Sequence, residues 1–253
     1  SGSGSAKSVK VIDNVIIPHS TLATANSCIF NIPKLVDDLD VSGNTIIAKS
    51  GKQYLARIGW QSATDATKVP KNIKFSKNNV LIDASAYMVD LSQVDGLYIK
   101  ENSLDASITT TASFGGFLGL QPGGAKKNIH IKNNEKIALG SRDFLLAYYQ
   151  QLSDLVIEDN HIFAENPDSA TRTLFNLNQQ VTKASIKRNT IKAGNQQLLS
   201  VGAGVATNAS FKCSDLKFND NVITHSCTNI AFEPRQCVNF SFCGNDVTAL
   251  AGG

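Results

Sequence analysis

The chain alternates apolar and polar residues over short stretches, and one such stretch recurs along its whole length. Its clearest copy is Leu155–Ile162, in which Asn160 follows two turn-forming residues. The Asn of the copies stands at Asn14, Asn44, Asn78, Asn102, Asn134, Asn160, Asn189, Asn221 and Asn245. Alternation with a period of two residues predicts strands rather than helices. Because the motif is constant while the distance between copies varies, the pattern predicts a solenoid with loops of unequal length.

Apolar residues accompany the Asn at fixed distances. They stand five and three positions before it and two positions after it in nearly every copy. Lys136 is the exception after Asn134, where Ile137 can take its place. A small residue stands four positions after the Asn in six copies, at Ala48, Ala106, Ala138, Ala164, Ala193 and Ala249. Two short strands that meet at the Asn, with one side always apolar, predict that each copy stacks on the next.

The Asn has a physical reason at this position. Its amide can bond the backbone of a sharp bend and also the Asn of the neighbouring coil, which makes a ladder. A second bend is predicted six residues earlier, at Asp38, Asn72, Gly96, Asn128, Asp154, Asp215 and Asn239. A third strand is predicted before it, at Cys28–Ile32, Tyr54–Ile58, Tyr87–Leu91, Phe117–Leu120, Phe144–Tyr148, Thr173–Leu177, Gln197–Val201 and Ile230–Phe232. The fold expected is an all-β, single-stranded, right-handed parallel β-helix of about nine coils, with three strands per coil.

Length and composition add few constraints. We expect residues 1–7, which include the Ser-Gly repeat, to be an appended linker, and residues 8–253 to be one β-helix domain. Neither end carries a polar cap or an amphipathic helix, so we expect a segment of a longer chain. The net charge of +3 gives no reason to expect a nucleic-acid partner. No apolar run reaches the ~20 residues of a membrane span.

Cysteine and histidine offer no cofactor or metal site. Cys213 and Cys237 stand eight residues before their Asn in neighbouring coils, so their strand spacing of about 4.8 Å would permit a disulfide. Val36 and Val94 hold the same position elsewhere, which favours two small core residues. The histidines are scattered, without the spacing of metal ligands, at His19, His130, His161 and His225.

An apolar stripe is predicted on the outside of the solenoid. Ile17 and Ile47 stand three residues after their Asn, where side chains point outward, and Leu81, Ile137 and Phe163 continue the column. Such a stripe needs a cover. A flanking loop and a neighbouring subunit are both open as the cover, and closed symmetry makes a homotrimer the oligomer expected.

A polar outer strip is predicted near the first bend, with side chains that bond sugar hydroxyls. It contains Asp90, Tyr148, Gln150, Glu233 and Arg235. Tyr149 lies beside it, and Trp60 is the one tryptophan, at a strand end where it can stack on a sugar or close the core. A neighbouring Gln column at Gln93, Gln151, Gln180 and Gln236 favours a structural amide ladder over a sugar-binding row.

A basic strip follows the strand before the Asn. Its members are Lys10, Lys74, Lys100, His130, Lys132, Lys187 and Lys217. Glu101, Glu158 and Asp159 interrupt it. A solvated face that discourages edge aggregation is the commoner explanation. A track for an acidic polysaccharide is the alternative.

The Leu-x-Ile-x-x-Asn-x-Ile motif, as in Leu155–Ile162, resembles the coils of the pectin-lyase-like β-helix superfamily. Within it, the Ser/Thr/Asn-rich coils and irregular loops are most similar to the shaft of a bacteriophage tailspike or capsule depolymerase. The resemblance implies a bacterial surface polysaccharide as ligand and a virion tail or extracellular, cell-surface location. The Asp clusters and Arg base of pectate lyases have no counterparts in this sequence, so calcium-dependent elimination is not expected.

Two functions follow as hypotheses. The first is a polysaccharide depolymerase, with Asp90, Glu158 and Glu233 as catalytic carboxylates and Trp60, Tyr148, Tyr149, Gln150 and Arg235 binding substrate. Hydrolysis would need two carboxyl groups about 5–9.5 Å apart; elimination by a different base stays open. The second is a non-catalytic structural shaft or glycan-binding adhesin module. No cofactor is expected for either.

Overall fold

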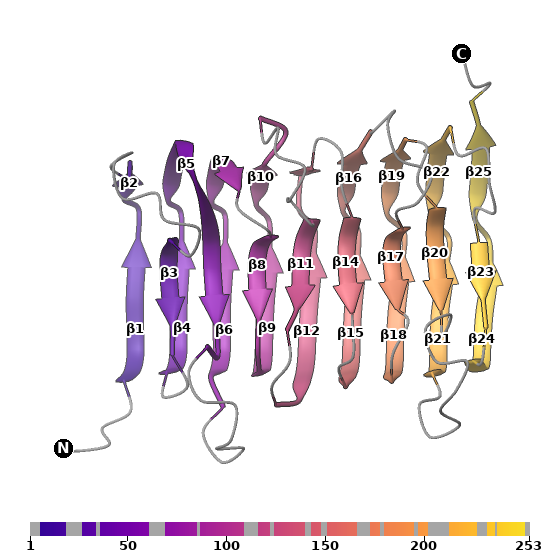
Figure 1. Cartoon of the computed structure of the whole chain (residues 1–253), viewed down its shortest axis with the longest axis horizontal. Coiled ribbons are helices and arrows are strands. Elements are labelled where there is room, and N and C mark those ends of the chain that lie inside the picture. Colours follow the sequence, from indigo (N-terminus) through magenta and orange to yellow (C-terminus); the bar gives the residue numbers. More distant parts are fainter. Residues whose placement is uncertain are drawn as a thin grey trace.

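The computed structural model describes residues 6–18, 27–33, 36–60, 69–84, 87–108, 116–121, 124–139, 143–147, 151–165, 173–177, 180–194, 197–201, 213–226, 232–235 and 237–250. These residues form β-strands joined by bends and turns (Figure 1). The described part of the chain contains no helix that could cross a membrane.

The strands form three parallel sheets, A, B and C. Sheet A contains β1 (Ala6–Ile12), β4 (Val36–Ser42), β6 (Lys71–Ser76), β9 (Val94–Lys100), β12 (Lys126–Lys132), β15 (Leu152–Glu158), β18 (Val181–Lys187), β21 (Cys213–Asn219) and β24 (Cys237–Cys243). Sheet B contains β2 (Val15–Ile16), the first part of β5 (Thr45–Ile58), β7 (Asn79–Ala84), β10 (Ser103–Asp105), β13 (Lys136–Ala138), β16 (His161–Ala164), β19 (Thr190–Ala193), β22 (Val222–His225) and β25 (Asp246–Ala249).

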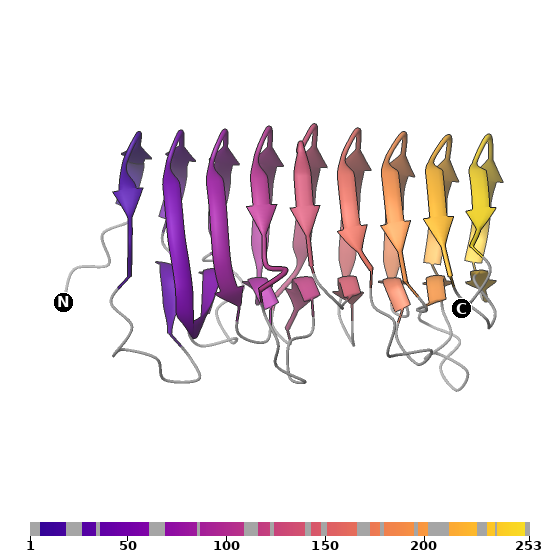
Figure 2. The ribbon, with the colours of Figure 1, turned by 90° about the horizontal axis from the view of Figure 1, so that it is seen from above.

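Sheet C contains β3 (Cys28–Ile32), the second part of β5, β8 (Tyr87–Leu91), β11 (Gly116–Leu120), β14 (Asp143–Ala147), β17 (Thr173–Leu177), β20 (Gln197–Val201) and β23 (Phe232–Pro234). Each strand pairs in parallel with the equivalent strand of the next repeat, as in β12 and β15. Successive repeats therefore stack side by side along one axis (Figure 2). The prediction of a parallel β-helix is confirmed.

The Asn column is the ladder that the sequence predicted. In the middle of the column, Asn160 Nδ2 donates to Asn189 Oδ1 at 2.9 Å, and its backbone N–H donates to the same oxygen at 3.1 Å. Asn160 Nδ2 also donates to Ile131 O of the preceding repeat at 2.9 Å. The same side-chain bond joins every successive pair from Asn14 to Asn245, at 2.7–3.2 Å. Each bend backbone is thus bonded to both neighbouring coils.

Two positions of every repeat adopt a left-handed backbone. The residues six positions before the Asn have positive φ at Ser8, Asp38, Asn72, Gly96, Asn128, Asp154, Lys183, Asp215 and Asn239, which confirms the second bend column. The residues directly before the Asn do so as well, at Asp13, Gly43, Lys77, Glu101, Asn133, Asp159, Arg188, Asp220 and Gly244. Asp, Asn and Gly are frequent here because they tolerate this conformation best. Gly43 additionally leaves room for Asp13, whose Oδ1 would lie 2.0 Å from an added Cβ.

The core lies between the three sheets. Leu97, Ile129 and Leu155 of sheet A are fully buried. Aromatic rings of sheet C and sheet A continue this packing, with centroid distances of 5.0 Å for Phe117–Phe144, 5.3 Å for Phe144–Phe175 and 5.9 Å for Phe175–Phe218. Edge-to-face and tilted rings at these distances stabilise the stack beyond the apolar area that they bury.

One coil departs from the predicted register. Ile137 pairs with Leu104 and Ile162 and is fully buried, so it lies in the core and not in the outward stripe. Ala138 pairs with Phe163 and therefore occupies the outward column instead of the small inward one. The cause is one additional residue between Asn134 and β13. Ile137 is thus the replacement for Lys136 that the sequence allowed.

The third strand of each repeat is placed well by the sequence. Four predicted ranges agree with β3, β8, β17 and β20 at both ends. The strand of the sixth repeat ends at Ala147, before Tyr148, and the last one is Phe232–Pro234.

Cys213 and Cys237 are register partners but are not bonded to each other, and Cys213 Sγ donates to Leu177 O at 3.4 Å. The interpretation of these cysteines as packing residues agrees with that geometry.

Candidate functional site: a polar groove on sheet B

Asp90 lies on the outer side of sheet C, but it is 1 % exposed. Arg57 of the neighbouring strand β5 places its Nε 3.4 Å from Asp90 Oδ2. The Arg57 guanidinium lies 3.6 Å from the centroid of the Trp60 ring. Burial raises the pKa of Asp90 to about 6, against the opposing effects of Arg57 and of Gln121. Asp90 and Trp60 therefore form an internal cluster with Arg57, in which the Trp60 ring stacks on the protein's own cation.

Glu233 occupies the same register position on β23, further along sheet C. Gln197 Nε2 donates to Glu233 Oε2 at 3.3 Å, and Arg235 forms an ion pair with Glu233. Thr173 Oγ1 donates to Gln197 Oε1 at 3.0 Å, which extends the chain of polar side chains over β17, β20 and β23. This row reaches the surface, because the Arg235 side chain is 58 % exposed.

Glu158 lies on sheet A, within the predicted basic strip. Its carboxylate is 3.1 Å from Lys132 Nζ, 3.2 Å from Lys187 Nζ and 3.5 Å from Arg188 Nη2. Burial raises the pKa of Glu158, but hydrogen bonds from Lys132 and Lys187 outweigh it and hold that pKa below its usual value. Glu158 is therefore the counter-ion of a cationic surface row and is ionised at neutral pH.

The three candidate carboxylates are not brought together. Asp90 on β8 and Glu233 on β23 are five strand spacings apart in sheet C, or about 24 Å at ~4.8 Å per strand. Glu158 faces outward from a different sheet. A pair of catalytic carboxyl groups needs a separation of about 5–9.5 Å. Tyr148, Tyr149 and Gln150 lie outside the described residues.

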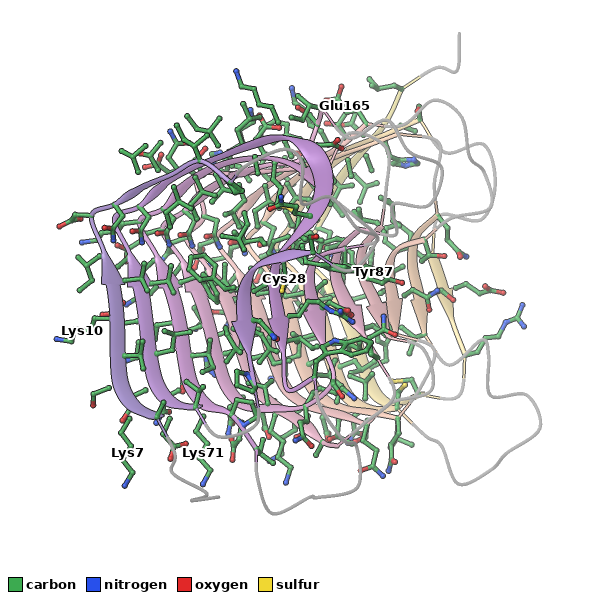
Figure 3. The ribbon with its side chains drawn as sticks, turned by 60° about the vertical axis from the view of Figure 1, so that its left-hand side comes forward. Lys7, Lys10, Cys28, Lys71, Tyr87 and Glu165 are labelled. Atoms are coloured by element: carbon green, nitrogen blue, oxygen red, sulfur yellow. The ribbon has the colours of Figure 1, made fainter. Side chains whose placement is uncertain are left out.

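Sheet A carries both signs of charge. Residues seven positions before the Asn alternate across neighbouring strands, in the order Lys7, Asp37, Lys71, Asp95 and Lys127. Opposite charges on adjacent strands attract, whereas like charges directly opposite each other destabilise a sheet. Lys7, Lys10 and Lys71 lie around the outer edge of this sheet in Figure 3. The face has the charge pattern of a solvated sheet surface.

Two hollows of the described surface lie along sheet B, and none of the sequence-predicted site residues that the structure describes lines them. One, of about 490 Å³, is lined by Glu165, Lys192, Ala193, Gly194, Thr224, Ser226 and Leu250. The other, of about 480 Å³, is lined by Ser107, Glu135, Lys136, Ala138, Phe163 and Glu165. Because Glu165 lines both, we treat them as one feature, the sheet-B groove. Glu165 points outward from this face in Figure 3.

The sheet-B groove combines one aromatic ring with charged and hydroxyl groups. Phe163 is partly exposed, and Lys192 Nζ lies 5.8 Å from its ring centroid. Lys136 Nζ donates to Asp105 Oδ2 at 2.6 Å. Burial raises the pKa of Asp105, but hydrogen bonds from Lys136 and Ser107 outweigh it and hold that pKa below its usual value. With Lys136 neutralised in this way, the groove carries no excess of positive charge among its described residues.

The sequence contained a signal for this groove. Outward positions three and five residues after the Asn supply Phe163 and Glu165 in one repeat, Asp105 and Ser107 in another, and Thr224 and Ser226 near the end. The same alternation predicted the apolar stripe in the first three repeats. The prediction of an apolar stripe did not take into account that the outward residues of sheet B change along the axis. They are apolar at Ile17, Ile47 and Leu81 and mostly polar in the later repeats.

The described residues contain no group of three or more His, Cys, Asp or Glu side chains placed to hold a metal ion. Comparison of the chain with protein-family models, with curated proteins and with solved structures gave no match.

Proposed function

We propose that this β-helix is a glycan-binding module that holds a polysaccharide along the sheet-B groove without cleaving it. The observation that carries the proposal is the groove itself. It follows the strand ends from β10 to β25, which is five strand spacings or about 24 Å, and Phe163 offers an aromatic face inside it. A long, open groove with an aromatic face, carboxylates and hydroxyl groups suits an extended ligand that is rich in hydroxyls.

The groove's charge balance defines the class of glycan. Its walls carry two carboxylates, Glu135 and Glu165, and two lysines, Lys136 and Lys192. Asp105 neutralises Lys136. A neutral polysaccharide, or one with amino sugars, fits this balance better than an acidic one. The resemblance of the coils to tailspike shafts supports a bacterial surface polysaccharide as ligand, and with it a virion-tail or extracellular, cell-surface location. The same resemblance supports a relationship between this chain and the pectin-lyase-like superfamily.

A homotrimer is part of the proposal. Ile17 is 69 % exposed, and Ile47 and Leu81 are partly exposed on the neighbouring strands of sheet B. An apolar stripe beside a polar groove suits a subunit contact that leaves the groove open.

Binding is tested with a panel of bacterial capsules and O-antigens, neutral and acidic, by isothermal titration calorimetry. We expect at least one neutral member to bind, and Phe163→Ala to weaken that binding about two- to twelvefold, since an aromatic contact contributes roughly 0.5–1.5 kcal/mol. Tyr98→Ala is the matched control, because Tyr98 is a partly exposed aromatic residue on the outer side of sheet A, where it packs on His130. If both variants bind like the unaltered protein, the ligand does not lie in the sheet-B groove.

A depolymerase is the second candidate, and one observation favours it. Asp90 has a pKa raised to about 6, within the range of a general acid. The same panel is therefore followed by size-exclusion chromatography and by the absorbance of unsaturated sugars. Shorter products would establish an enzyme, and Asp90→Asn, Glu158→Gln and Glu233→Gln would then show which carboxylate is required. Unchanged polymer length with retained binding supports the non-catalytic module.

A further inference from the structure

One coil of sheet B contains an extra residue, and this residue changes which side chains point outward. Ser103 follows Asn102 directly, whereas one residue separates Lys136 from Asn134 in the next coil. Ser103 and Lys136 are nevertheless register partners, so both stand at the outward position that opens the strand. The extra residue therefore places a lysine on the outer face of β13, and it brings Ala138 into the outward column two residues later.

Ala138 leaves space in a column where the neighbouring strands carry larger side chains. Over consecutive strands the column reads Leu81, Asp105, Ala138, Phe163 and Lys192. Asp105 and Phe163 are two strand spacings apart, or about 9.6 Å at ~4.8 Å per strand, with a single methyl group between them. The hollow of about 480 Å³ is lined by Ala138 and Phe163, and its volume is within the range of small-ligand sites.

The two sides of the Phe163 ring have different neighbours. Ala138 on β13 and Lys192 on β19 flank Phe163 from opposite sides of β16. Lys192 Nζ lies 5.8 Å from the ring centroid. A ligand that enters from the β13 side therefore reaches the aromatic ring across a methyl group and not across an ammonium group.

Lys136 lines the same hollow, and Asp105 holds its ammonium group. Lys136 Nζ donates to Asp105 Oδ2 at 2.6 Å. The other oxygen of the carboxylate is fixed by Ser107, which donates to Asp105 Oδ1 from its backbone N–H at 2.9 Å and from its Oγ at 2.6 Å. Hydrogen bonds between charged groups are shorter and stronger than neutral ones. The lysine is thus neutralised at the wall of the hollow by a carboxylate that is itself held in place.

This pairing decides what an acidic sugar would encounter. The ammonium group of Lys136, if it were unpaired, would attract the carboxylate of a uronic acid. With Asp105 in place, the acidic sugar instead faces a neutralised lysine together with Glu135 and Glu165, whose carboxylates line the same hollow. Like charges brought together at a binding site select against the wrong partner. An uncharged sugar does not experience this repulsion.

We propose that the hollow over Ala138 holds one sugar unit of the polysaccharide against Phe163, and that Asp105 excludes acidic sugars from this subsite by neutralising Lys136. The inference rests on the proposed glycan-binding function, to which it adds the position of a subsite and the residue that sets its specificity. Asp105 acts through Lys136, so it is a positioning residue.

The first experiment changes the charge of both the protein and the ligand. Alginate, a polymer of uronic acids, and each acidic polysaccharide of the panel are tested beside their carboxyl-reduced forms, in which hydroxymethyl groups replace the carboxylates. Isothermal titration calorimetry gives the Kd for both forms, and we expect the unaltered protein to prefer the reduced one. Asp105→Asn should shift this preference about two- to fivefold toward the acidic form, as expected for a partly exposed ion pair. Asn keeps an acceptor for Ser107 but leaves Lys136 charged, so adding Lys136→Gln should abolish the shift, and high salt should reduce it.

Glu135→Gln is the matched control for this experiment. It removes the same charge from the same hollow and leaves the pair of Asp105 and Lys136 in place. An equal shift in this variant would show that net charge alone sets the specificity, and would overturn the role of Asp105. Binding of the neutral forms without a shift in Asp105→Asn would overturn the inference and keep the proposed function. Absence of binding to every neutral form would overturn both.

The second experiment fills the hollow. Ala138→Leu introduces the side chain that Leu81 already presents in the same column, so the strand accommodates it. Far-ultraviolet circular dichroism and melting confirm that the variant folds. We expect it to weaken binding of the neutral polysaccharide at least as much as Phe163→Ala does. Ser76→Leu, which adds the same side chain to the outer side of sheet A, should leave binding unchanged. If Ala138→Leu binds like the unaltered protein while Phe163→Ala binds more weakly, the sugar unit does not lie over Ala138.

Discussion

At the scale of the residue, the fold depends on what one side chain can bond at a bend. An Asn carries two amide protons and an acceptor oxygen on a short stem, and it uses them in three directions. Asn160 donates to the preceding coil at Ile131 O, to its own coil at Glu158 O and to the following coil at Asn189 Oδ1. Asp would keep the acceptor and lose all three donated bonds. This explains why the position stays Asn while the residue before it varies among Asp, Gly, Lys, Glu, Asn and Arg.

Substitution of Asn160 tests this role. Asn160→Leu removes the partners of buried backbone groups in two coils, so we expect the free energy of unfolding to fall by about 1–3 kcal/mol. Urea denaturation followed by circular dichroism measures the change. Asn14→Leu is the matched control, since Asn14 is exposed at the end of the ladder and has one neighbouring Asn. Equal losses in the two variants would show that the ladder does not explain the effect.

At the scale of the element, the strands of sheet A are held together outside by charge and inside by apolar packing. Lys132, Glu158 and Lys187 stand on three consecutive strands, with the carboxylate between the two cations. Without it, the two ammonium groups and Arg188 would repel each other on a surface that is only partly solvated.

Glu158→Gln should therefore lower stability at neutral pH by about 1 kcal/mol, because its partners are partly exposed and solvent screens the pairs. The folded-state pKa of Glu158 is lowered from 4.5, so its contribution is present above that value and is lost as pH falls below it. Urea denaturation at pH 7 and pH 3 should show a smaller difference between the two proteins at pH 3 than at pH 7. Glu101→Gln, whose side chain is 43 % exposed and 3.8 Å from Lys77, should change stability by less than about 0.5 kcal/mol.

The elements were predicted more completely than the candidate site. Period-two alternation places β3, β8, β17 and β20 at both ends because every third strand must bury the same face. The predicted site failed to assemble because Asp90 and Glu233, although they share a register position, stand five strands apart along sheet C, and because Glu158 lies on sheet A. Distance from the Asn gives the position of a residue within its coil but not its distance along the solenoid axis.

At the scale of the whole molecule, sheet B changes character along the axis. Its first strands carry the outward stripe of Ile17, Ile47 and Leu81, and its later strands carry the groove. One face can thus serve a subunit contact near one end and a ligand near the other.

The trimer is tested by light scattering of the unaltered protein. We expect a mass three times that of the chain, and a single-chain mass after Ile47→Glu, because a charge in the stripe would be buried at the contact. Val156→Glu, on the outer side of sheet A, should leave the mass unchanged. A single-chain mass for the unaltered protein would contradict the trimer.

The sequence by itself determined the solenoid, its Asn ladder and its bends, because these features depend on local geometry that repeats in every coil. Only the tertiary structure decided which outward residues are accessible. Asp90 is buried beside Arg57, although its position in the strand is an outward one. Lys126 is fully buried at a position held by Val94 and Leu152 in the neighbouring coils, and its Nζ donates to Gln121 O at 2.7 Å and to Gly124 O at 3.0 Å. Burial lowers the pKa of Lys126 to about 8. Such sites depend on segments that differ from coil to coil, and a repeat predicts only what its copies share.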